Sequence, residues 1–183
     1  MMFKKYVALA VLAAGLAVAG SAHAEFYAAG GIGASFNGGT SHNKSGMKSA
    51  FENSVAVSLA GGYELPLPLF DIRGEAELIH NRPKLKNHQT KKLDGMFLNA
   101  YGTIPLIPLI DPYVGLGIGR VRFDHSNAFA VQGILGAEYE LTFAPMTVGA
   151  EYRHLKTNGK TGAKDAHSKY HADILMFKVR YLF

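Results

Sequence analysis

Charged side chains recur at every second position in several apolar segments of this 183-residue chain. One such set is Asp71, Arg73, Glu75 and Glu77. Carboxyl and basic groups this close together can transfer protons or form ion pairs. Because two carboxylates on one strand face are common, pairs such as Glu138 and Glu140 do not by themselves indicate acid–base catalysis. No catalytic residue is assigned from them.

Other residues that could take part in chemistry form weaker patterns. The glycine-rich segments 30–33 and 115–119 do not stand between a strand and a helix, so they do not predict a phosphate-binding loop. His167 and His171 are four residues apart with no helix to align them, and the chain has no cysteine. We therefore expect no metal site and no cofactor.

The N-terminal segment 1–24 has the features of a cleaved secretory signal. Lys4 and Lys5 precede an apolar run over 7–19, and Ala22-His23-Ala24 ends the segment. The run is too short for a membrane-spanning helix, which needs about 20 residues. Cleavage would leave a mature domain of residues 25–183. Without the two lysines the formal net charge falls from +5 to about +3, which does not indicate a nucleic-acid partner.

The mature chain alternates apolar and polar residues over eight segments, which predicts eight β-strands. They cover 25–36, 53–65, 70–81, 93–104, 112–123, 128–141, 146–155 and 171–183. Short proline-containing connections at 66–69, 105–111 and 142–145 alternate with longer polar ones at 37–52, 82–92 and 156–170, and with a short one at 124–127. Short turns at one end and long loops at the other are typical of an outer-membrane barrel. We predict an all-β, antiparallel, up-and-down transmembrane barrel with short periplasmic turns and longer extracellular loops.

One face of each strand is apolar and the other is small or charged. A soluble sandwich or lipocalin-like barrel would turn the apolar face inward. Aromatic residues near the strand ends of the apolar face, with the export signal, favour lipid instead; these are Phe26, Tyr63, Phe70, Tyr139, Tyr152, Tyr181 and Phe183. The lumen would then hold an ion-pair network of Glu64, Asp71, Arg73, Glu75, Glu77, Glu138, Glu140, Glu151, Arg153, Lys178 and Arg180. An eight-stranded lumen has room for little except side chains, so we interpret the network as a structural plug.

Arg120 and Arg122 fall on the apolar face of their strand. Arg120 would lie about 21 Å above Pro112, at the outer interface, where arginine can reach lipid phosphates. Contact with lipopolysaccharide is one interpretation, and a bulge that turns both inward is the other. The long loops are basic and could attract polyanions; their candidate contacts are Arg82, Lys84, Lys86, Lys91, Lys92, Lys156, Lys160 and Lys164. Ordinary solvated loops would have the same composition.

Three segments resemble the opacity-protein and neisserial-surface-protein-A family of small outer-membrane barrels. They are "VSLAGGYELPLPLFDIRGEAELIHNR", "PYVGLGIGRVRF" and "GAEYELTFAPMTVGAEYRHL", followed by the terminal "FKVRYLF". The resemblance implies a surface-exposed barrel whose loops meet host ligands or lipid. "DHSN" at 124–127 resembles the His-x-Ser-Asn of outer-membrane lipid A deacylases. Here His125 and Ser126 are adjacent and would point to opposite strand faces, so we do not expect an enzyme.

The expected function is therefore surface interaction through the loops, in adhesion, host-factor or lipopolysaccharide binding, or envelope integrity. A narrow porin-type channel is the alternative, and a lipid A-modifying enzyme is less favoured. Phe183 and Tyr181 end the chain in the alternating pattern of the signal read by the outer-membrane assembly machinery. We thus expect that machinery, periplasmic chaperones, and outer-membrane lipid and lipopolysaccharide as partners.

Overall fold

The structure is a computed structural model that describes residues 25–42, 48–50, 53–67, 69–81, 93–104, 110–123, 126–158 and 168–183. The predicted signal segment and the centres of the predicted long loops lie outside these ranges. Within them, no helix is both long enough and apolar enough to cross a membrane.

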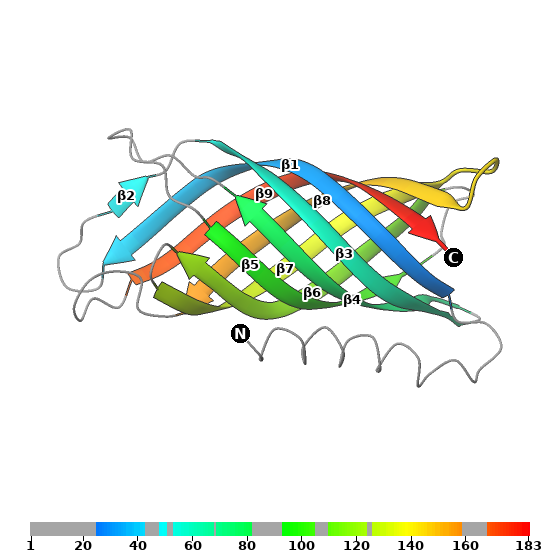
Figure 1. Ribbon diagram of the computed structural model, residues 1–183, viewed down its shortest axis with the longest axis horizontal. Coiled ribbons are helices and arrows are strands. Elements are labelled where there is room, and N and C mark those ends of the chain that lie inside the picture. Colours follow the sequence, from blue (N-terminus) through cyan, green and yellow to red (C-terminus); the bar gives the residue numbers. More distant parts are fainter. Residues whose placement is uncertain are drawn as a thin grey trace, which may run out of the picture.

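Eight long antiparallel strands close into a barrel, which confirms the predicted fold class (Figure 1). In chain order the strands are β1 (Glu25–His42), β2 (Lys48–Ala50), β3 (Ser54–Pro66), β4 (Asp71–Asn81), β5 (Leu93–Thr103), β6 (Ile110–Phe123), β7 (Ser126–Glu140), β8 (Met146–Asn158) and β9 (Ser168–Leu182). Each long strand pairs with its neighbour in the chain, and β1 pairs with β9 to close the ring. The short β2 pairs only with the end of β1. Closure leaves none of the eight long strands of the described barrel wall with a free edge, as a membrane interior requires.

Several strands extend further than their sequence patterns predicted. The predicted loop boundary at 37 is wrong, because residues 39–42 of β1 pair with residues 168–171 of β9 beyond a register shift after Phe36. The predicted loop 156–170 is also too long, because β8 continues to Asn158 and β9 starts at Ser168. Glycine, asparagine and threonine gave these segments a loop-like composition. Pairing with strands far away in the sequence overrides that local preference.

The strand faces follow the predicted alternation. On the outside, Leu59, Leu98 and Leu116 are between 62% and 75% exposed. Exposure of many large apolar side chains would be costly in water but is favourable against lipid. The interior face carries buried residues from every long strand.

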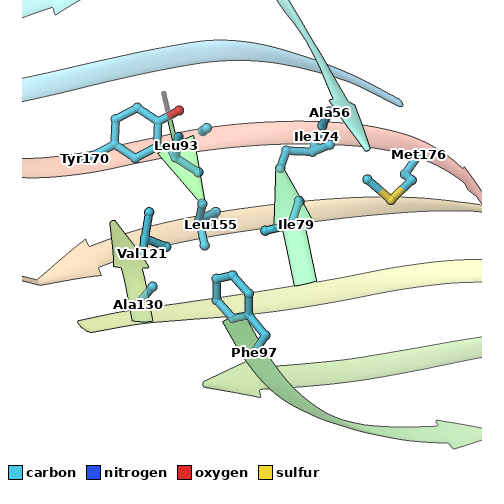
Figure 2. Packing of buried hydrophobic residues seen from close by; sticks show 11 residues of the cluster. Ala56, Ile79, Leu93, Phe97, Val121, Ala130, Leu155, Tyr170, Ile174 and Met176 are labelled. Carbon is cyan, nitrogen blue, oxygen red and sulfur yellow. The ribbon is translucent and has the colours of Figure 1, made fainter. Parts of the chain in front are cut away.

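The barrel interior has two layers. The half nearer the long loops is packed with apolar side chains, including Phe97, Val121, Leu155 and Ile174 (Figure 2). The half nearer the short turns contains the charged side chains with Tyr27, Tyr101 and Tyr113, whereas Tyr170 belongs to the apolar layer. The sequence interpretation predicted only the charged layer.

Candidate functional site

Arg153 lies at the centre of the charged layer. It comes from β8, is 0% exposed, and donates from Nη1 to Glu77 Oε2 of β4 over 2.6 Å. Its Nε donates to Glu151 Oε1 over 2.7 Å, and its Nη2 also pairs with that carboxylate. Tyr113 donates its hydroxyl hydrogen to the other Glu151 oxygen over 3.0 Å. The guanidinium thus compensates two buried carboxylates, which would otherwise be costly to bury.

Glu75 forms the second centre of this layer. Both of its carboxylate oxygens accept from Lys178 Nζ, over 2.9 and 2.8 Å. The hydroxyl groups of Tyr101 and Tyr27 donate to it over 2.8 and 3.1 Å, and the Asn99 amide donates over 3.2 Å. This carboxylate on β4 therefore connects β1, β5 and β9 across the lumen.

The third centre lies closest to the short turns. Glu138 of β7 pairs with Arg73 of β4 over 2.5 Å and with Arg180 of β9 over 2.7 Å. Arg180 also pairs with Glu64 of β3. The Arg73 guanidinium lies 4.8 Å from the ring centroid of Tyr113, a cation–π distance. The ion pairs therefore join strands that are not neighbours in the ring.

The structure brings together nine of the eleven residues that the sequence placed in the lumen. They are Glu64, Arg73, Glu75, Glu77, Glu138, Glu151, Arg153, Lys178 and Arg180. Asp71 is half-buried at the start of β4, and Glu140 is exposed at the end of β7. Both lie at the short-turn rim, beyond the level of the network.

The charges of the network compensate one another. Each of its five carboxylates is paired with a cation, so none is left as an isolated acid or base. A cavity of about 10 Å³ lies between Arg73, Glu75, Glu138 and Lys178, close to the room one water molecule needs. Paired charges and apolar packing fill the described lumen.

Arg120 and Arg122 point outward from β6 and are exposed. The pairing of β6 with β5 and with β7 is regular through both residues, so no bulge turns them inward. Arg120 stands opposite Met96 and Phe129. Arg122 stands opposite Asp94, whose Oδ1 lies 2.5 Å from His80 Nδ1.

A second outward polar cluster lies on β8 and β9, and the sequence interpretation missed it. Asp173 Oδ1 accepts from the Tyr152 hydroxyl over 2.6 Å and lies 2.6 Å from His154 Nδ1. Tyr152, which was predicted to belong to an interfacial girdle, is exposed on the outer face and also bonds this carboxylate. The sequence signal for this cluster is a set of polar residues at positions of β8 and β9 that face lipid. Their contact with one another depends on how the two strands pair.

The remaining predicted residues lie at the barrel ends. Arg82, Lys84, Lys86, Lys91, Lys92, Lys160 and Lys164 fall outside the described residues, as do Asp124 and His125. Lys156 is exposed on β8 rather than in a loop. Phe183 donates its backbone N–H to Phe26 O over 2.9 Å, and its ring contacts that of Tyr181. Within the described ranges, no group of three or more potential ligands is placed to hold a metal.

Comparison with known proteins agrees with this architecture. The family model described as "Outer membrane protein beta-barrel domain" matches residues 6–183. No match was found among curated protein sequences. Neisserial surface protein A superposes with a TM-score of 0.59 at 15% identity, over 88% of this chain and 100% of that one. The enzyme PagL gives 0.57 at 12%, over 83% and 97%, and OprG from Pseudomonas aeruginosa gives 0.53 at 13%, over 87% and 95%. At these identities the likeness concerns the fold alone.

Proposed function

Because this chain belongs to the outer membrane protein β-barrel domain family and is located in the bacterial outer membrane, we propose that it acts through its outer surface. Its rim arginines and basic loops bind phosphorylated or sulfated polyanions, first of all lipopolysaccharide. Adhesion to host ligands and support of the envelope would follow from that binding.

The observation that carries this proposal is the position of Arg120. It lies ten residues beyond Ile110 on β6, which at about 3.4 Å per residue and a tilt near 40° is about 26 Å along the membrane normal. The apolar band of such barrels is about 25 Å tall. Arg120 therefore reaches the level of the outer phosphate groups.

The neighbours of the two arginines favour an external anion. Arg120 has only the apolar Met96 and Phe129 directly opposite it in the ladder, so no carboxylate there competes for the guanidinium. Arg122 shares its row with Asp94, whose carboxylate contacts His80. A guanidinium binds phosphate through two parallel hydrogen bonds, which a water-poor interface strengthens.

The test measures binding of the folded protein to vesicles with and without lipopolysaccharide. Changing both arginines to glutamine should weaken the lipopolysaccharide-dependent binding about tenfold, or about 1.4 kcal/mol. The double lysine variant is the matched control, because it keeps both charges and should lose less. Unchanged binding in a glutamine variant that still shows a heat-modifiable gel shift would refute the arginine contact.

A second variant tests how much the long loops contribute to polyanion binding. Replacing residues 82–92 and 159–167 by short turns should abolish binding to polyanionic surfaces while the barrel still folds, because the exchanged segments contain most of the loop lysines. Binding that persists in this variant would show that the loops are not the binding elements.

Two alternatives have less support. A narrow channel would need a continuous path, whereas apolar side chains fill one half of the described lumen and ion pairs fill the other. Lipid A modification rests on His125 and Ser126 alone; unchanged lipid A mass spectra on overexpression would count against it.

A further inference from the structure

The outward cluster on β8 and β9 contains ionisable residues on a surface that faces lipid. Asp173 and His154 stand directly opposite each other, and the side chain of Asp173 is only 14% exposed. A carboxylate held at membrane depth is costly unless it is paired, so ionisable residues there usually have a function. The Tyr152 hydroxyl and the His154 imidazole provide that pairing.

Asp173 fixes the orientation of the imidazole. Because Asp173 Oδ1 lies 2.6 Å from His154 Nδ1, the other ring nitrogen, Nε2, is turned away from the carboxylate. The imidazole is 41% exposed, so Nε2 can reach a group outside the protein. A carboxylate bonded to one ring nitrogen fixes the orientation of the imidazole and the direction in which the second nitrogen points.

A basic row lies next to this pair, on the side of the long loops. Lys156 stands directly opposite His171, and both side chains are exposed. His154 and Lys156 lie eight and ten residues beyond Met146, about 21 and 26 Å along the membrane normal. The cluster therefore occupies the boundary between acyl chains and headgroups.

We propose that His154, Lys156 and His171, with Asp173 as the positioning residue, form a binding site for the phosphate group of an outer-leaflet lipid. Lys156 provides a cationic donor to the phosphate. The imidazolium form of His154 donates from Nε2, because its Nδ1 faces Asp173. Below the row, Leu175 and Phe177 continue the same outward face of β9 and are exposed, so the acyl chains have an apolar surface to cover.

The site is separate from the rim arginines of β6, because β7 lies between β6 and β8. It depends on the outward face of β8 and β9 meeting lipid, and not on any contact of Arg120 or Arg122. The two proposals can therefore fail independently.

The test uses the mature chain folded in an uncharged detergent and follows the imidazole ¹⁵N signal that disappears in His154→Gln. Dioleoylphosphatidate, dioleoylglycerol and inorganic phosphate are titrated in turn. Phosphatidate should shift the His154 signal saturably, at least tenfold more tightly than inorganic phosphate, and dioleoylglycerol should leave it unchanged. Lys156→Gln should weaken the phosphatidate titration at least fivefold, and Lys156→Arg should restore most of it.

Two results would overturn the site. One is a His154 signal that phosphatidate does not move. The other is an equal response to dioleoylglycerol or to inorganic phosphate, which would show a response to chains or to free phosphate instead of to a lipid phosphate. The variant with Arg120 and Arg122 changed to glutamine should keep the wild-type titration; loss of it there would assign the signal to the rim arginines. A heat-modifiable gel shift verifies the fold of every variant.

Discussion

At the scale of single residues, Arg153 is the side chain on which the interior depends most. It is fully buried and compensates Glu77 and Glu151, so Arg153→Met would leave two carboxylates unpaired inside the barrel. Breaking a buried ion pair from one side typically costs about 3–5 kcal/mol. We expect a loss of that size in the free energy of unfolding, measured by denaturant titration in lipid vesicles.

The combined variant Arg153→Met, Glu77→Gln and Glu151→Gln separates the effect of charge on stability from the effect of packing. Because it removes the charges together, it should recover most of the stability lost in the single variant. A single variant within about 1 kcal/mol of wild type, or a combined variant that is no better, would contradict this view of the network.

At the scale of the strands, Gly119 lets β6 lie close against the interior of β5. A Cβ at this position would overlap the Met96 carbonyl oxygen and lie 2.6 Å from the Phe97 ring. Gly119→Ala should therefore destabilise the barrel by about 1–3 kcal/mol, as overpacking does. Gly133→Ala on neighbouring β7 is the matched control, because its Cβ would meet nothing within 4 Å. Equal unfolding midpoints for the two alanine variants would show that the space at position 119 accommodates a methyl group.

The strand scale also shows what the sequence could predict. Alternation alone assigned the faces of β4, because Arg73, Glu75 and Glu77 mark one side clearly. It did not reveal the apolar interior layer, because Phe97, Val121 and Ile174 lie on three different strands and only strand pairing brings them to one level. Asp173 and His154 are 19 residues apart, and only the β8–β9 register brings them together. Register depends on pairing between distant segments, which a local pattern does not contain.

At the scale of the whole molecule, the C-terminus closes the ring and is also the predicted assembly signal. Leu182 and Phe183 donate backbone hydrogen bonds to Pro145 and Phe26, while the Phe183 side chain is 78% exposed. Deleting Phe183 removes little packing, so refolding in detergent should change little. Assembly into outer membranes in cells should slow markedly, measured as the rate at which the heat-modifiable form appears. Equal slowing of both processes would make Phe183 a structural residue only.

We expect the lumen to be a filled core and the binding chemistry of the protein to lie on its outer surface. The interior shows the two features this requires: an apolar layer around Phe97 and a paired network around Arg153. Planar-bilayer recording of the purified, heat-modifiable protein tests the claim most directly. We predict no unitary conductance above the bare bilayer at either polarity. Reproducible single-channel steps from the folded barrel, absent from mock preparations, would contradict a filled lumen and restore the channel alternative.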